Sequence, residues 1–150
     1  MKKLKKVAFV LIIVFVGIQF IPTTRNQSSE VLSTDFNRTF EVPQDIQKIL
    51  RSSCYDCHSN YTFYPWYNKV QPVSWILENH IKEGKAELNF SAFGDYSKRR
   101  KKSKLKSIIS QIKDKEMPPS YYTLMHGDAK LSSEKREQLI EWMDKLRDNL

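Results

Sequence analysis

The sequence predicts an all-α fold. Only four of its 150 residues are glycine, and no segment of any length alternates apolar and polar residues as a half-buried strand would. Apolar residues instead recur at helical spacing in several segments after residue 40. The expected architecture is therefore a small set of helices joined by loops.

The N-terminus has the pattern of an export signal. Lysines at positions 2, 3, 5 and 6 precede an apolar run, Val7–Ile18, which Phe20 and Ile21 extend as far as Pro22. No small-residue cleavage site follows, so an uncleaved signal anchor over residues 1–22 is expected rather than a released protein, although a spanning helix usually needs about 20 residues. The lysines favour a cytoplasmic N-terminus, which would place the rest of the chain in the periplasm, outside a bacterial inner membrane.

Residues 23–40 are polar and lack periodicity, so they are predicted to form a tether. Residues 41–150 are long enough for one small domain with a modest core. Without the four N-terminal lysines, 21 basic residues stand against 17 acidic ones. The net charge therefore does not indicate a nucleic-acid partner.

Four helices are predicted in the domain. They run from 43 into a cysteine motif at 54, from about 72 to 84, from about 96 to 115, and from 133 toward the C-terminus. Proline marks the start of the first two, and Ser132 or Ser133 caps the last. Each helix has an apolar face. These faces comprise Ile46, Ile49, Leu50, Val73, Ile76, Leu77, Ile81, Leu105, Ile108, Ile109, Ile112, Leu139, Met143 and Leu146, with Trp142 beside the last three.

The segment Cys54-Tyr55-Asp56-Cys57-His58 carries the most specific chemistry in the chain. Its C-x-x-C-H spacing places two thiols on one side of a helical turn, where both can reach the two vinyl groups on one edge of a porphyrin. The imidazole that follows can bind the iron from below. The motif predicts one covalently bound haem c, with thioethers from Cys54 and Cys57 and with His58 as the proximal iron ligand.

Three other roles for the cysteine pair remain as alternatives, and the sequence supports each of them less well than a haem. A thioredoxin-like dithiol belongs at a strand-to-helix turn, and no parallel-strand pattern precedes Cys54. A structural zinc site needs four ligands, and without further cysteines only His80 and His126 could complete one. A disulfide across two residues would be strained and would leave His58 without a role.

Met117 is the predicted distal iron ligand. It lies in Glu116-Met117-Pro118-Pro119, a segment that resembles the distal-ligand segment of small c-type cytochromes. A soft thioether binds ferrous iron well and raises the potential relative to a second imidazole, and the prolines stiffen the loop. The alternative is that Met117 only ends the third helix, because Pro118 forbids its continuation.

Two histidines compete with Met117 as distal ligand. His126 is the alternative distal ligand, because imidazole binds iron as readily as a thioether; otherwise it is a polar residue on the approach to the last helix. His80 falls on the apolar face of the second helix, where a lone histidine is more often packed and hydrogen-bonded than metal-bound.

Two further expectations concern the surroundings of the motif. The segment Tyr61–Tyr67 is too aromatic for an exposed loop, so it is expected to pack the core, to wall the haem, or both. The imidazole of His58 needs an acceptor for its other ring nitrogen. Resemblance to small c-type cytochromes implies a backbone carbonyl near a proline for this role, either at Pro72 or at Pro65.

A strongly basic run covers Lys98–Lys106. It is the solvated face of the third helix, or it is a docking surface for an acidic redox partner or an anionic membrane. Nucleic-acid binding does not suit an exported protein.

Several segments together resemble the haem-binding domain family of bacterial membrane-anchored proteins. The similarity spans roughly 43–145. The segments that carry it are Cys54–Asn60, Tyr64–Tyr67, Val70–Trp75, Leu88–Ser91, Glu116–Tyr121 and His126 through Ala129–Ser132, with Gly127 where proline is expected. The family occurs beside cytochrome c and di-haem peroxidase-type domains, which implies a role in respiratory or peroxide-linked electron transfer.

The sequence therefore predicts a small, cytochrome c-like, all-α domain around one covalently bound haem, behind an N-terminal membrane anchor. Its expected function is single-electron transfer with redox partner proteins at the periplasmic face, rather than catalysis. The alternative is a haem-based sensor or a peroxide-linked haem protein whose sixth ligand position is open or displaceable.

Overall fold

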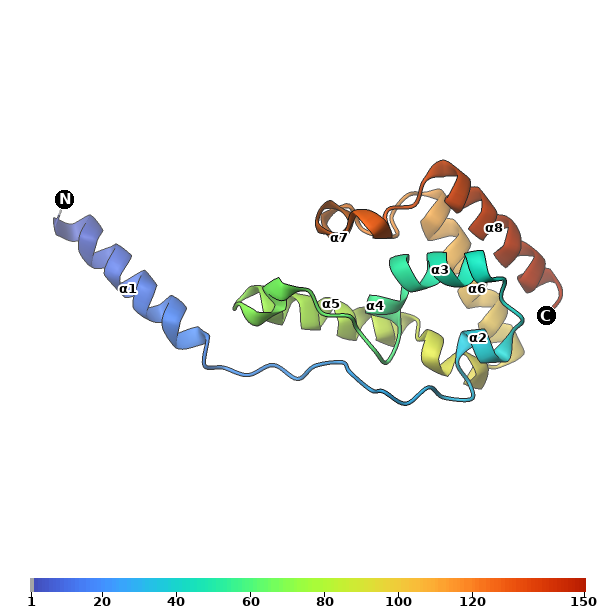
Figure 1. Cartoon of the computed structure of the whole chain (residues 1–150), viewed down its shortest axis with the longest axis horizontal. Coiled ribbons are helices and arrows are strands. Elements are labelled where there is room, and N and C mark those ends of the chain that lie inside the picture. Colours follow the sequence, from blue (N-terminus) through green and yellow to red (C-terminus); the bar gives the residue numbers. More distant parts are fainter. Residues whose placement is uncertain (1) are drawn as a thin grey trace.

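The computed structural model describes residues 2–150, which fold into helices and loops without a named strand (Figure 1). Gln27 and Tyr61 form one isolated antiparallel bridge in this range. The all-α prediction is thus confirmed. The helices are α1 (Lys2–Ile18), α2 (Phe36–Thr39), α3 (Gln44–Ser53), α4 (Tyr55–His58), α5 (Val73–Glu87), α6 (Lys98–Lys113), α7 (Ser120–Met125) and α8 (Ser133–Asp148), with 3-10 turns η1 (Trp66–Lys69), η2 (Phe90–Asp95) and η3 (Gly127–Ala129).

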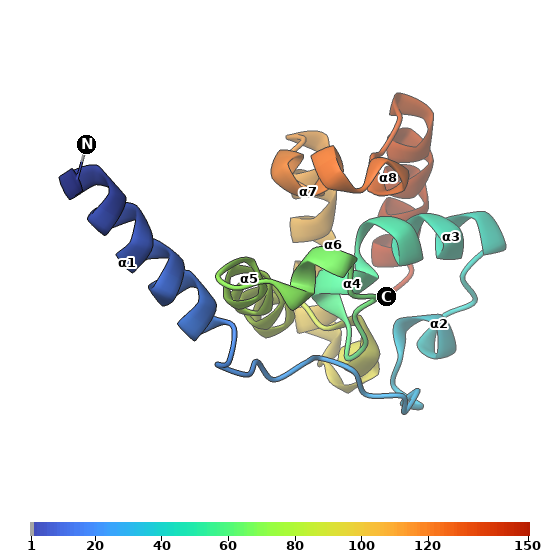
Figure 2. The ribbon, with the colours of Figure 1, turned by 60° about the vertical axis from the view of Figure 1, so that its left-hand side comes forward.

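The helix α1 stands apart from the domain and joins it only near its C-terminal end (Figures 1 and 2). There the side-chain amide of Gln19 bonds the backbone of Gln71 in both directions, at 2.9 and 3.2 Å, and the hydroxyls of Thr23 and Ser74 lie 3.0 Å apart. Within residues 2–150, no helix combines the length and the apolar character that crossing a membrane requires.

The core lies where α6 and α8 pack together and α3 crosses α8 (Figure 2). Leu50, Leu105, Leu139 and Met143 contribute fully buried side chains from these three helices. Burial of such a side chain stabilises the fold by about 1.5–3 kcal/mol. The apolar faces predicted for the first, third and last helices are therefore confirmed as core.

The apolar face predicted for α5 is wrong in its first turns. Val73 and Ile76 are 40% and 53% exposed, whereas Ile81 is buried. The N-terminal half of α5 extends beyond the core, toward the end of α1 (Figure 1), and these two side chains stay exposed there. The helix also continues past Gly84 to Glu87.

Other helix ends follow their capping chemistry. The hydroxyl of Ser132 accepts a hydrogen bond from the amide of Lys135 and begins α8 as predicted. The first predicted helix runs into the cysteine motif as expected. It ends at Ser53, because the backbone of Cys54 leaves the helical region (φ −131°) and separates α3 from α4.

The segment 23–40, predicted as a tether, packs along the domain instead. The side-chain amide of Asn26 donates to the carbonyl of Ser59 and to the hydroxyl of Thr62, both at 2.9 Å. The ring of Phe36, at the start of α2, is fully buried in the core, and its centroid lies 4.9 Å from that of Phe93. Local sequence could not show this, because each partner lies far along the chain.

Candidate haem site

The cysteine motif is held on the single turn of α4, between α3 and α5. The amides of Cys57 and His58 both donate to the carbonyl of Cys54, at 3.2 and 3.0 Å. The two thiols and the imidazole therefore belong to one compact turn. Both cysteines are half-buried and free of a disulfide.

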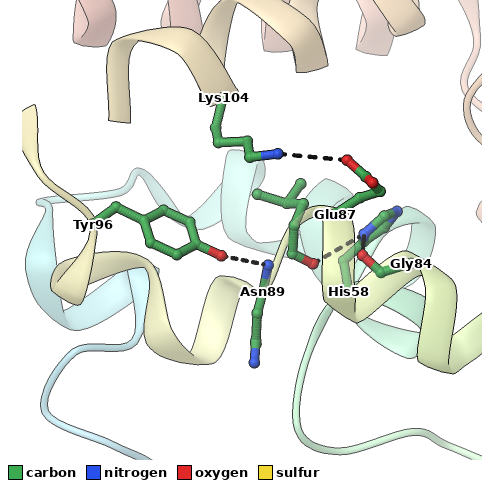
Figure 3. Close-up of polar contacts among 7 residues, drawn as sticks. His58, Gly84, Glu87, Asn89, Tyr96 and Lys104 are labelled. Carbon is green, nitrogen blue, oxygen red and sulfur yellow. Dashed lines mark hydrogen bonds and ion pairs between the residues drawn. The ribbon is translucent and has the colours of Figure 1, made fainter. Parts of the chain in front are cut away.

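His58 is oriented by two backbone carbonyls, one in the last turn of α5 and one just after it (Figure 3). Its Nδ1 lies 2.8 Å from the carbonyl oxygen of Gly84 and 3.1 Å from that of Leu88. A carbonyl oxygen can only accept, so Nδ1 carries the hydrogen and Nε2 keeps its lone pair in the neutral ring. Burial lowers the pKa of the imidazole, although these two hydrogen bonds oppose that shift. The ring is thus prepared to bind a metal through Nε2.

The acceptor expected from the comparison with small cytochromes was therefore wrong. The carbonyls of Pro72 and Pro65 do not bond His58; those of Gly84 and Leu88 do. The carbonyl of Gly84, in the last turn of α5, also accepts a hydrogen bond from the amide of Leu88, whose own carbonyl lies just past the end of the helix.

Gly84 permits the close approach of α5 to the motif. A Cβ atom at this position would lie 2.8 Å from the carbonyl oxygen of Cys57 and 3.4 Å from Cε1 of His58. Such a distance to backbone requires one element to move. Glycine is therefore needed here for packing, not for an unusual backbone angle.

Two adjoining cavities, of about 270 and 240 Å³, open beside the motif. Both are lined by Cys54, His58 and Met117. The wall of the larger one is mostly apolar and includes Leu88, Phe90, Ile108, Ile112 and Leu131. The cysteine motif and Met117 thus face one largely apolar cleft, although they are 59 residues apart in the sequence.

The two competing histidines occupy different places. His126 lines neither cavity: its Nε2 is bonded to the hydroxyl of Tyr67 at 2.6 Å, and its ring stacks on Tyr122 with centroids 4.3 Å apart. His80 lines the smaller cavity and lies against the ring of Tyr121. Of the two, the structure brings only His80 to the cleft that contains His58.

The thiols of the motif lie in surroundings that disfavour their ionised form. Burial raises the pKa of Cys54 to about 12, and the neighbouring Cys57 adds to this shift. Burial likewise raises the pKa of Cys57 to about 11, with a contribution from Asp56. Protonated cysteines are poor disulfide-exchange nucleophiles, so these surroundings do not favour a redox dithiol.

The aromatic segment Tyr61–Tyr67 does not wall the cleft. None of its residues lines either cavity, and Phe63 and Trp66 are 76% and 74% exposed. The expectation of a buried segment was wrong for these two rings. Tyr64 and Tyr67 instead bond residues outside the segment, at Glu78 and His126.

An all-helical domain with a largely apolar cleft beside an imidazole has the features of a small helical protein that holds a prosthetic group. The match to the family described as "Haem-binding domain" covers residues 13–145. The chain belongs to this haem-binding domain family. The match begins 30 residues before the region of resemblance seen in the sequence, and it includes the segment that packs along the domain. Neither the curated proteins nor the solved structures gave a match.

The residues of the cleft fit a haem. Two thiols, an imidazole with Nε2 free of hydrogen and a thioether surround a mostly apolar space. Among residues 2–150, no three His, Cys, Asp or Glu side chains gather closely enough to hold a metal ion by themselves. A porphyrin-borne iron needs only two axial protein ligands, so this set suits it better than it suits a bare ion.

Proposed function

We propose that the domain binds one haem covalently, as haem c, and transfers single electrons. The observation that carries this proposal is the orientation of His58, whose Nδ1 is engaged by two carbonyls at the side of a cleft that also contains Cys54 and Met117. The iron of a bound haem would supply the one-electron couple that the protein side chains lack.

The roles of the motif residues follow from their chemistry. The S–H of Cys54 and that of Cys57 would each add across one vinyl group, so that a C–S bond forms and the hydrogen goes to the neighbouring vinyl carbon. This addition needs no oxidant and leaves no by-product. His58 would bind the iron through Nε2, and the carbonyls of Gly84 and Leu88 would fix its tautomer and strengthen it as a donor.

Met117 is the side chain proposed for the distal side. It lines both cavities with His58, whereas His126 is engaged by Tyr67 and Tyr122. A thioether ligand would favour the ferrous state relative to a second imidazole and suits an electron carrier. Met117 is 37% exposed, so another ligand could displace it from the iron. A sensor or peroxide-linked role is therefore the competing outcome of the test.

Export to the periplasm and attachment to the inner membrane are part of the proposal. They rest on the lysines in the first turns of α1, which precede its apolar run in the pattern of an export signal. A redox protein with an acidic surface is the proposed partner, and the exposed lysines and arginines of Lys98–Lys106 are the proposed contact.

The test is an optical spectrum of the chain expressed in a host with haem-maturation machinery. We expect a c-type spectrum after reduction and a pigment that stays with the protein during acid–acetone extraction. The oxidised protein should show the weak methionine–iron charge-transfer band, which Met117→Ala abolishes and His126→Ala retains. Covalent haem without that band, together with rapid binding of carbon monoxide, would replace the carrier by a sensor or peroxide-linked protein.

A further inference from the structure

The larger cavity has one polar side, which α6 supplies. Lys104, Ser107 and Gln111 line it at helical spacing, beside the apolar Ile108 and Ile112 of the same helix. The sequence placed Lys104 in a basic run without distinguishing it from its neighbours. In the structure its side chain is 24% exposed and lines the cavity, whereas Lys102 and Lys106 are exposed to solvent.

Lys104 has only a loose partner. Its Nζ lies 3.6 Å from Oε2 of Glu87, whose side chain is 84% exposed (Figure 3). An ion pair with one partner so open to water contributes at most about 1 kcal/mol, and the glutamate can turn into solvent. The ammonium of Lys104 is therefore available to another anion inside the cavity.

The two cavities differ in the charged side chains that line them. Lys104 is the one lysine or arginine that lines either cavity, and it belongs to the larger. The acidic residues Asp56 and Glu83 line only the smaller cavity, and Glu87 lines both. A carboxylate on a ligand would be repelled at the smaller cavity and attracted at the larger one.

We propose that the ammonium of Lys104 binds a carboxylate of the bound porphyrin, with Ser107 and Gln111 as neighbouring hydrogen-bond donors. This inference rests on the proposed function. A haem carries its two propionates on the edge opposite its vinyl groups, so a porphyrin attached at Cys54 and Cys57 would direct its carboxylates away from the cysteine motif. Lys104 thereby selects one orientation of the porphyrin, with its carboxylates toward α6.

The test compares a porphyrin that has carboxylates with one that lacks them. The full chain with Cys54→Ala and Cys57→Ala is titrated with haemin and with haemin dimethyl ester, and the affinity ratio of the two is the readout. We expect Lys104→Gln to lower the preference for the free acid about tenfold, as loss of one charge-assisted contact implies. Lys106→Gln removes the same charge from an exposed site of the same helix and should leave the ratio unchanged.

Two results would overturn the inference. An equal ratio in Lys104→Gln and in the parent chain would do so. If the cysteine-free chain binds neither porphyrin, a second experiment tests the contact. In it, the amines of the wild-type chain are labelled chemically with and without bound haem. The reactivity of Lys104 should then fall several-fold on loading while that of Lys106 stays constant; equal labelling of Lys104 would refute the contact. Failure of the proposed function gives a different result from failure of this inference, because the wild-type chain would then carry no covalent haem at all.

Discussion

The hydroxyl of Tyr122 donates a 2.9 Å hydrogen bond to Oδ2 of Asp56 and so ties α7 to the middle of the C-x-x-C-H motif. The ring of Tyr122 also stacks on His126, whose Nε2 is bonded to the hydroxyl of Tyr67. The loop that follows Met117 is thus fixed to the same turn that carries the proximal histidine. The distance between the two proposed axial ligands depends on these contacts.

Tyr122→Phe should loosen this loop. Loss of a hydrogen bond to a carboxylate is expected to lower the free energy of unfolding by about 1.5–3 kcal/mol. In the haem-loaded protein, the methionine–iron band should weaken and carbon monoxide should bind faster to the reduced form. Tyr121→Phe is the matched control, because Tyr121 is 60% exposed and its hydroxyl makes no hydrogen bond within the described residues. Equal spectra and stabilities for the two variants would contradict this role of Tyr122.

Gly84→Ala should displace α5 from the motif. The added Cβ would lie 2.8 Å from the carbonyl oxygen of Cys57, and such overpacking typically costs about 1–3 kcal/mol. Urea unfolding of the haem-free chain would measure this cost, and a lower yield of covalent haem should accompany it. Gly127→Ala meets no atom within 4 Å and should change stability by less than about 1 kcal/mol in either direction. If Gly84→Ala changes neither the stability nor the yield of covalent haem, the motif does not need this close approach.

The thiols of the haem-free chain should react slowly with iodoacetamide near neutral pH. Because the pKa of Cys57 is raised to about 11 and that of Cys54 to about 12, each has at least about a hundredfold less thiolate at pH 8 than an ordinary cysteine. The rate should rise about tenfold per pH unit through this range, and Cys57 should react before Cys54. Peptide mapping of the alkylated chain provides the measurement. Rapid alkylation at pH 7 would favour the redox-dithiol alternative.

A chain that begins at residue 41 should fold poorly, although residues 41–150 were predicted to form the domain. It lacks Phe36, which is fully buried among the aromatic rings of the core, and removal of such a ring costs about 3–5 kcal/mol. A chain that begins at Thr23 retains Phe36 and the hydrogen bonds of Asn26. Circular dichroism during thermal unfolding compares the two, and equal transition temperatures would restore the tether interpretation.

Local features of this protein could be read from its sequence. The apolar spacing of α3, α6 and α8 predicted their buried faces, because helical periodicity encodes burial directly. The C-x-x-C-H spacing predicted a compact turn, and the cap at Ser132 predicted the start of α8. The ligand roles of Cys54, Cys57, His58 and Met117 stay predictions.

Features that depend on distant partners could not be predicted in this way. The carbonyls that orient His58 come from the end of α5, and neither Gly84 nor Leu88 carries a side-chain signal for that role. The packing of Phe36 and the exposure of Trp66 likewise depend on which elements cover them. Lys104 differs from its basic neighbours only because α6 turns it toward the cavity.

The covalent attachment of haem is tested most directly by mass spectrometry of the chain from a haem-maturing host. The intact mass should exceed that of the polypeptide by one haem, and after digestion this mass should remain on the peptide that contains Cys54 and Cys57. Cys54→Ala together with Cys57→Ala should remove it. A chain of unmodified mass, isolated where a control cytochrome c is fully loaded, would contradict the account.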